Sequence, residues 1–349
     1  MTILGIDHVE FYVGDLEESA AVLCRDFGFR SPEATATPGE PDGRSVLLRQ
    51  GRIRLLLTTA AAPGHRAARF VQRHGDGVAS IAFRTDDVRQ AFEAAVAGGA
   101  EAISAPTLAD YGDGLILQAV VSGFGDVTHR LVEQVGPVSE GGAEGNRNGE
   151  LFEDLDHAAI CLRPGQIEAV VRFYRTAFGF GHTFDERIEV GGQAMISKVV
   201  QDPAGAVTFT LLEPDPELAP GQIDQFLAAH DGAGVQHLAL RTPDIVRAVR
   251  TLSDRGIEFL AAPDGYYRSL EGRLGAFNFP VDVLRDVNVL ADRDQWGQLF
   301  QIFSHSTHER RTFFFELIER RGARTFGTGN IKALYEALNE EQTSSAPRP

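Results

Sequence analysis

The chain has 349 residues, which is more than one hydrophobic core usually fills, so two domains are expected. Its formal net charge of −16 excludes nucleic acid and an anionic membrane as partners, because either would require a basic footprint. No apolar run approaches the roughly 18 residues of a membrane span, and we expect no secretion signal at the N-terminus. We expect a cytoplasmic protein in which Cys24 and Cys161 are buried thiols rather than a disulfide.

The chain contains two copies of one sequence pattern. Gly5–Val9 is echoed by Asp154–Ala158, and each opening is followed by a helical stretch that ends in Phe-Gly-Phe. Further along, Gly77–Pro106 matches Gly234–Pro263. Each copy is therefore predicted to form a strand, a helix and several further strands.

A second helix is predicted in the middle of each copy, at Asp86–Ala97 and at Asp244–Asp254, where apolar residues recur at helical spacing. The tail Gly329–Glu341 has the pattern of an amphipathic helix. The stretch between the copies is polar and rich in glycine, which is typical of a linker. The predicted units are a first domain without a metal site (1–138), a linker (139–150), a second, catalytic domain (151–341) and a disordered tail (342–349).

Three potential metal ligands lie at repeat-matched places of the second copy: His157, His237 and Glu316. Each lies in an apolar stretch with strand-like alternation, so Leu155 and Val235 are predicted to share a face with the histidine two positions on. A buried carboxylate costs several kcal/mol unless it is paired, protonated or bound to a metal. Two imidazoles and one carboxylate form the facial triad of non-haem Fe(II) oxygenases. The alternative is three separately satisfied core residues, which the repeat-matched positions disfavour.

The first copy carries His8, Ser80 and Arg130 at the corresponding positions, in the same order. Only one potential ligand remains, so no metal site is predicted there, and His8 is assigned a structural role. His74 stands beside a Gly-Asp-Gly run and is interpreted as a turn residue.

The ligand set, the paired copies and the segments Gly297–Phe303 and Phe326–Glu336 resemble the family of 4-hydroxyphenylpyruvate dioxygenases, which includes 4-hydroxymandelate synthases. The resemblance covers nearly the whole chain. It implies an α+β, vicinal-oxygen-chelate (glyoxalase/dioxygenase-like) fold, in which tandem βαβββ modules form half-open barrels and a C-terminal helix is the lid. It also implies Fe(II) as cofactor and 4-hydroxyphenylpyruvate and O2 as partners. We expect a homo-oligomer, most simply a dimer.

The resemblance also implies which residues form the substrate pocket. Where dioxygenases usually read Pro-Ile-Asn-Glu-Pro, this chain has Thr210 and Leu212 in place of the proline and the amide, and Ile331 replaces a phenylalanine of the lid helix. Both changes resemble the synthase. They predict oxidative decarboxylation with hydroxylation of the benzylic carbon, which gives 4-hydroxymandelate and CO2. The other implied pocket residues are Ser197, Gln222, Gln236, Gln301, Phe303, Phe326, Asn330 and Tyr335.

Three alternatives remain open. Neutral drift within a dioxygenase would leave homogentisate, the product of tyrosine catabolism, as the product. A non-catalytic binding protein of the same fold is disfavoured by the intact triad, and measured iron content would decide. An extradiol dioxygenase shares the ligand types, but the two C-terminal segments do not suit it, and catechol turnover would decide. The resemblance to the synthases also implies a role in antibiotic biosynthesis.

Overall fold

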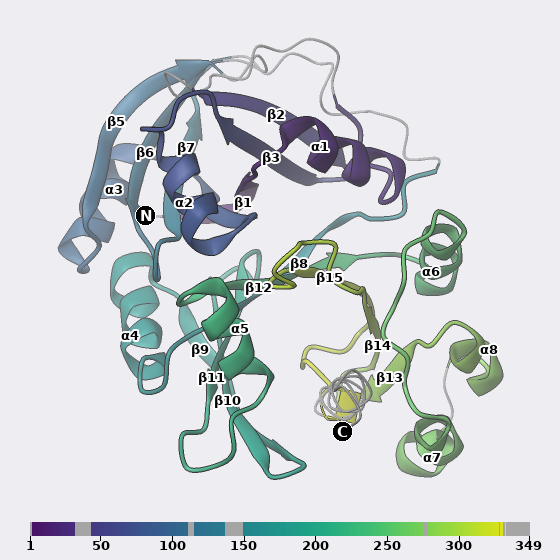
Figure 1. Cartoon of the computed structure of the whole chain (residues 1–349). Helices are drawn as coiled ribbons and strands as arrows, with labels where there is room; N and C mark the ends of the chain where they lie inside the picture. The colour runs from purple at the N-terminus through teal and green to yellow at the C-terminus, as the bar shows by residue number, and fades with distance from the viewer. Residues whose placement is uncertain are drawn as a thin grey trace, which may run out of the picture.

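The computed structural model describes residues 2–31, 43–110, 115–136, 149–275, 278–327, 329–330 and 332. Most of the predicted linker, nearly all of the predicted lid helix and the whole predicted tail lie outside these ranges. Within them, two curved sheets are each covered by helices, and each sheet draws on one copy of the repeat (Figure 1). No helix in these ranges is long and apolar enough to cross a membrane.

The first module is built on a sheet of seven strands in the order β2-β3-β1-β4-β7-β6-β5. The pairs β1–β3 and β4–β7 are parallel and the others are antiparallel. Its strands are β1 (Ile3–Tyr12), β2 (Gly43–Gln50), β3 (Ile53–Ala60), β4 (Gly77–Thr85), β5 (Ala102–Asp110), β6 (Leu115–Ser122) and β7 (Thr128–Gln134). Its helices are α1 (Leu16–Arg25), α2 (Arg66–His74) and α3 (Val88–Ala97).

The second module is built on a sheet of eight strands in the order β13-β14-β15-β12-β8-β11-β10-β9. Its parallel pairs, β8–β11 and β12–β15, correspond to those of the first module. Its strands are β8 (Asp154–Cys161), β9 (Gly181–Val190), β10 (Gln193–Gln201), β11 (Thr208–Pro214), β12 (Gly234–Arg241), β13 (Leu290–Arg293), β14 (Gln298–Phe303) and β15 (Phe314–Arg321). Its helices are α4 (Ile167–Phe178), α5 (Gln222–His230), α6 (Ile245–Asp254), α7 (Asp264–Leu274) and α8 (Val281–Asp286).

The helices predicted in the middle of each copy are confirmed as α3 and α6, and the two begin in the same way. Asp87 and Asp244 are the N-caps, and each side chain accepts a hydrogen bond of 2.9 Å from the backbone three residues on. Glu133 and Glu319, from β7 and β15, each accept a further 2.9 Å bond from the first helical N–H. These acceptors satisfy N–H groups that a helix leaves unpaired at its start and place negative charge at the positive end of its dipole.

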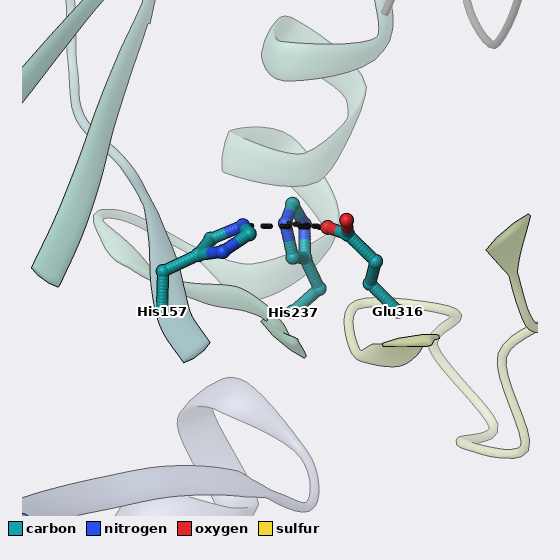
Figure 2. A group of neighbouring side chains, drawn as sticks. All are labelled: His157, His237 and Glu316. Atoms are coloured by element: carbon teal, nitrogen blue, oxygen red, sulfur yellow. Dashed lines mark ion pairs between the residues drawn. The ribbon is translucent and has the colours of Figure 1, made fainter. Parts of the chain in front are cut away.

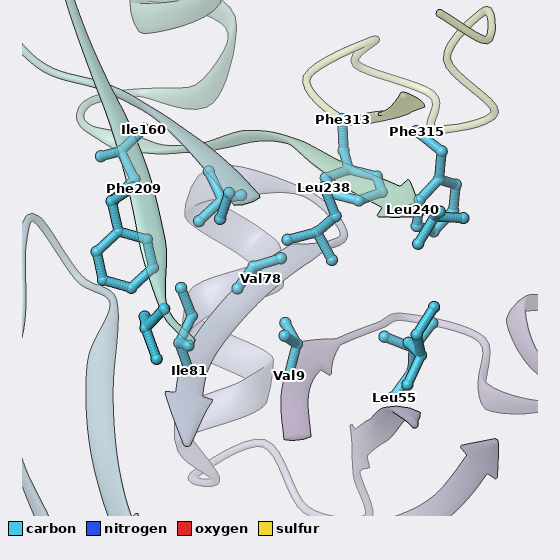
Figure 3. Close-up of a cluster of buried hydrophobic side chains, with 14 of the residues drawn as sticks. Val9, Leu55, Val78, Ile81, Ile160, Phe209, Leu238, Leu240, Phe313 and Phe315 are labelled. Atoms are coloured by element: carbon cyan, nitrogen blue, oxygen red, sulfur yellow. The ribbon is translucent and has the colours of Figure 1, made fainter. Parts of the chain in front are cut away.

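One hydrophobic core joins the two modules (Figure 3). It takes alternate residues of the central strands, such as Val9 and Ile81 from the first module and Phe209 from the second, all with no exposed surface. Since side chains alternate along a strand, the residues between them face the interior of their own module. Cys161 is buried on the other face of β8, and Cys24, which packs against this core, is only partly buried. Both are free thiols, as predicted.

Polar contacts also cross between the modules, and one of them shows that the turn prediction for His74 is wrong. His74 is the last residue of α2 and is only 2% exposed. Its ring stacks on His230, at the end of α5, with 4.4 Å between ring centroids. Its Nδ1 lies 2.6 Å from the His230 carbonyl oxygen, and its Nε2 lies 2.8 Å from the Asp126 carboxylate. The Gly-Asp-Gly run indicated a turn, but the helix extends to His74 because this residue is buried between the modules.

Candidate metal centre

Three strands bring His157, His237 and Glu316 together (Figure 2). The Nε2 atoms of both histidines lie 3.3 Å from the same oxygen of Glu316, and the three ligand atoms lie within 4.8 Å of one another. All three side chains are buried, with exposed fractions of 8% or less. Residues separated by 159 positions in the chain thus form one compact set of two imidazoles and one carboxylate.

The register of the sheet explains why these side chains meet. On the central strand β12, Ala239 pairs with His157 on one side and with Glu316 on the other. His237 lies two residues before Ala239 and therefore projects from the same face. The inner face of the eight-stranded sheet, turned away from the inter-module core, is thus the surface that carries the triad.

Irregular pairing makes part of the predicted strand pattern wrong. The register between β12 and β8 shifts from Val235 to His237, so two residues of β12 stand against one of β8. This β-bulge reverses the alternation, and Val235 packs in the inter-module core while His237 faces inward. A second shift beside His157 likewise leaves Leu155 packed against that core. Neither residue shares a face with its histidine, contrary to the sequence prediction.

An aspartate and an arginine hold His157 in place. Asp156 Oδ1 lies 3.0 Å from His157 Nδ1, and Arg320 donates to both oxygens of Asp156 at 2.7 and 2.8 Å. An Nδ1–H donated to a carboxylate leaves Nε2 free to bind a metal and orients the ring. The Arg320 guanidinium lies 5.1 Å from the centre of the Phe326 ring, which in turn meets His157 edge-on with 5.1 Å between centroids.

The sequence reasoning missed Asp156 and Arg320. The signal that could have found the aspartate is the Asp-His dipeptide, which occurs in both copies, at Asp7 and Asp156. Arg320 lies 164 residues from Asp156, and no local spacing connects the two. Only the position of β15 in the sheet brings the arginine to the aspartate.

The charges of the centre are strongly coupled. Burial opposes charge at His157, but Glu316 and Asp156 outweigh it and raise the pKa of this histidine to about 9. Burial likewise opposes charge at Glu316, yet the two histidines lower the pKa of its carboxyl to about 2. At His237, burial prevails and lowers the pKa. The carboxylate is therefore held in its anionic form, which is the form that binds a cation.

Four predicted pocket residues come from β10, β11 and α5, beside the triad. Thr210, on β11, pairs with Ala159, which lies two residues after His157 on β8. Leu212, also on β11, pairs with Ser197 on the neighbouring strand β10. All three predicted residues on these strands are buried. Gln222 is half-buried and begins α5, whose apolar residues pack on Leu212.

The remaining described pocket residues come from β12, β14 and the segment after β15. Phe303 pairs with Glu316, and Gln301 lies two residues before it on the same strand. Gln236 Oε1 lies 3.4 Å from His237 Nδ1. Asn330 has no exposed surface and accepts a 2.7 Å hydrogen bond from the hydroxyl of Tyr266. Phe326 meets His157, as described above, while Ile331 and Tyr335 lie outside the described residues.

Known proteins match nearly the whole chain in sequence and in structure. Residues 5–132 and 154–302 match the Glyoxalase/Bleomycin resistance protein/Dioxygenase superfamily. The 4-hydroxyphenylpyruvate dioxygenase of Coccidioides posadasii is 33% identical, with 97% of this chain and 93% of the relative covered. The enzyme of the same name from Xenopus tropicalis is 32% identical, over 97% of this chain and 91% of the relative.

Two solved structures place the fold more closely. A triple mutant of 4-hydroxymandelate synthase from Streptomyces coelicolor matches with a TM-score of 0.87 and 45% identity, over 98% of this chain and all of that one. A Mn(II)-bound glyoxalase from Novosphingobium aromaticivorans shares the fold alone, with a TM-score of 0.55 and 12% identity over 91% of this chain and 82% of that one. The chain therefore belongs to the Glyoxalase/Bleomycin resistance protein/Dioxygenase superfamily and, within it, to the family of 4-hydroxyphenylpyruvate dioxygenases and 4-hydroxymandelate synthases. The α+β fold of paired half-barrels expected from the sequence is confirmed.

Proposed function

We propose that the protein is an Fe(II)-dependent 4-hydroxymandelate synthase. It converts 4-hydroxyphenylpyruvate and O2 into 4-hydroxymandelate and CO2. One oxygen atom of O2 forms a bond to the benzylic carbon. The other becomes part of the new carboxylate, which forms from the keto carbon when the adjacent carboxyl group leaves as CO2. The observation that carries the proposal is the 45% identity with a 4-hydroxymandelate synthase along the whole chain, against 33% or less for the dioxygenases named above.

The donor set fits the proposed metal. His157, His237 and Glu316 would hold the iron through two nitrogens and one oxygen, and all three ligand atoms already converge. A 2-His-1-carboxylate set with open positions is characteristic of non-haem Fe(II) oxygenases. When bound, Fe(II) supplies the electrons that activate O2 and a Lewis-acidic centre for the 2-oxo acid. Asp156 and Arg320 keep His157 in the orientation that presents Nε2.

Two buried amides among the predicted pocket residues support a polar substrate. Among the described residues, Gln301 Oε1 and Asn330 Nδ2 are buried and have no hydrogen-bond partner. A buried donor or acceptor without a partner costs about 1–3 kcal/mol, so a ligand that bonds to it gains that amount. One atom accepts and the other donates, and a hydroxyl group, such as the phenol of 4-hydroxyphenylpyruvate, can bond to either kind of atom.

The shape of the inner wall favours the benzylic product. Leu212 and Thr210 present apolar and small surfaces where, by the resemblance above, dioxygenases usually carry an amide and a proline. Leu212 gives the hydroxyphenyl ring no polar partner where an amide would, so the ring takes its orientation from the predicted contacts with Gln301 and Asn330. The pocket then brings the benzylic carbon, rather than the ring, to the oxidant.

Product analysis tests the proposal. The iron-loaded protein, supplied with 4-hydroxyphenylpyruvate and O2, is expected to release 4-hydroxymandelate, identified by chromatography against standards of this acid and of homogentisate. Homogentisate as the main product would return the protein to the dioxygenase branch, which is the second candidate. Absence of either product, with stoichiometric binding of the substrate, would indicate a binding protein.

A further inference from the structure

A cleft between the modules concentrates positive charge in an acidic protein. It encloses about 660 Å³ and is lined by residues from the ends of strands of both sheets. This volume lies within the range of small-molecule sites, about 300–1,000 Å³. The described residues that line the cleft include three aspartates and seven arginines: Arg49, Arg52, Arg54, Arg84, Arg241, Arg320 and Arg324. The whole chain, by contrast, has 33 basic and 49 acidic residues.

The aspartates of the cleft neutralise only part of this charge. Asp154 contacts both Arg52, at 2.7 Å, and Arg241, at 3.3 Å. Asp7 contacts Arg54 at 3.1 Å, and Asp156 is bound to Arg320, as described above. Among the described residues that line the cleft, arginines thus exceed aspartates by four.

Arg49 and Arg54 stand directly opposite each other on the paired strands β2 and β3. Burial lowers the pKa of Arg49, and the positive charge of Arg54 lowers it further, while Asp7 only partly offsets the two effects. Like charges side by side in a half-buried place raise the free energy of the folded state. An anion in the cleft would relieve this repulsion. Guanidinium groups also bind carboxylates and phosphates through two parallel hydrogen bonds.

We propose that this arginine cleft is a binding site for a small multivalent anion of the phosphate or carboxylate class. Its volume of about 660 Å³ suits a small molecule rather than an extended polyanion. The cleft is distinct from the metal centre, because none of the three triad residues is among the described residues that line it. It borders that centre, however, through Asp156, Arg320 and Phe326. The site therefore goes beyond the proposed reaction and does not depend on it.

Calorimetric titration of the metal-loaded full chain with inorganic phosphate, and separately with succinate, tests the proposal. We expect saturable binding that weakens as salt is added, because screening reduces the attraction of the arginines. Binding of phosphate alone, of succinate alone or of both would each support the site and would name the source of its ligand. No saturable binding of either anion would overturn it.

Paired variants locate the binding. Arg84→Gln combined with Arg324→Gln removes two exposed arginines of the cleft and should weaken anion binding by at least about tenfold. Arg49→Gln should weaken it as well. The matched control, Arg89→Gln combined with Arg172→Gln, removes two exposed arginines from α3 and α4, away from the cleft, and should bind within about twofold of wild type. Equal weakening by the cleft pair and the control pair would show a general charge effect and overturn the site.

Discussion

The inner faces of the two sheets carry charged residues at matched positions. The two modules differ in how these buried charges are compensated. In the first module, Arg130 lies 3.1 Å from the carboxylate of Glu10 and 2.8 Å from the amide of Gln118, and Thr58 donates to Glu10 at 2.8 Å. Glu10 and Arg130 thus form a buried ion pair in this interior. In the second module, Glu316 stands where Arg130 does and faces two histidines. We call the first interior closed, because Glu10 and Arg130 neutralise each other there. We call the second interior open, because the carboxylate of Glu316 can bind a cation.

In both modules an aspartate contacts the first histidine of the repeat, His8 or His157. The Asp-His contact is 2.7 Å in the first module and 3.0 Å in the second. In each case the aspartate is also bound by an arginine, Arg54 or Arg320. An aspartate and an arginine therefore stand beside both His8 and His157, although Arg54 comes from β3 and Arg320 from β15. The modules also differ at the other two ligand positions. The ion pair of the first module also requires Glu10, whose place in the second module is taken by Ala159.

The largest expected effect comes from removing the carboxylate of the open interior. Glu316→Ala leaves two imidazoles as ligands, so iron affinity should fall by more than about 100-fold and oxygen consumption should stop. The matched change in the first module, Arg130→Ala, should leave iron content unchanged. Metal analysis after dialysis measures both. Equal iron loss in the two variants would show that the centre is not confined to the second module.

The closed interior should respond in stability rather than in iron. Arg130→Met leaves Glu10 buried without its cation, which should lower the free energy of unfolding by about 3–5 kcal/mol. Adding Glu10→Gln removes the unpaired charge and should restore most of that loss. Urea denaturation of the single and double variants measures the difference. A double variant as unstable as the single one would mean that burial of an unpaired charge is not the cause.

A third contrast lies at the inter-module core, where His129 occupies the place that Phe315 has in the second module. His129 stacks on Phe83 and binds the hydroxyl of Tyr174 at 2.9 Å. Burial lowers the pKa of His129 from 6.5 to about 4. The unfolded chain therefore takes up a proton between these pH values that the folded chain does not, so stability falls as the pH drops from about 6.5 to 4, by about 3 kcal/mol.

His129→Phe should remove this dependence on pH while lowering stability at pH 8 by about 1 kcal/mol, through the lost bond to Tyr174. Burial also lowers the pKa of His230 to about 4, so the slope of stability against pH should be reduced rather than abolished. Urea denaturation at pH 8 and pH 5 measures it. An unchanged slope in the variant would contradict the role of His129.

A smaller effect is expected where the supporting arginine is removed. Arg320→Gln leaves Asp156 without its bidentate partner, so His157 should lose its fixed orientation and iron affinity should fall by about 10- to 100-fold. Gln134 holds the same repeat position in the first module, and Gln134→Ala should leave iron affinity unchanged. Titration with Fe(II) measures both. Wild-type affinity in Arg320→Gln would show that the arginine serves the fold alone.

Periodic features of the fold could be predicted from the sequence, whereas features that depend on pairing between distant strands could not. The repeat and the strand alternation were sufficient to predict that His157, His237 and Glu316 lie at one site. The faces of Val235 and Leu155 were mispredicted, because a β-bulge has no local signature that separates it from a regular strand.

The partners of buried polar side chains were equally inaccessible. Arg320 reaches Asp156 only because β15 and β8 both flank β12, and the arginine cleft exists only where the ends of strands from both modules meet. The pocket residues Ile331 and Tyr335 remain predictions from the resemblance.

The smallest expected effect is on the choice of product, and it compares the two modules once more. Leu212 occupies the sheet position that Thr58 has in the first module. Leu212→Asn supplies a polar partner on the wall of the open interior, so part of the substrate should turn its ring toward the oxidant and yield ring-attack products. Only about 1 kcal/mol of difference between the two barriers is needed to change the ratio of products about fivefold. Combining Leu212→Asn with Ile331→Phe should shift the ratio of products further.

The control is Thr58→Leu, which removes the bond to Glu10 in the closed interior and should lower stability by about 1 kcal/mol without altering the product. Chromatography of reaction mixtures gives the ratio of homogentisate to 4-hydroxymandelate for each variant. Because Leu212 is buried beside the proposed substrate site while Thr58 lies in the other module, only the first change can act on the substrate directly. An unchanged ratio in both Leu212 variants would show that the wall formed by β11 does not select the product.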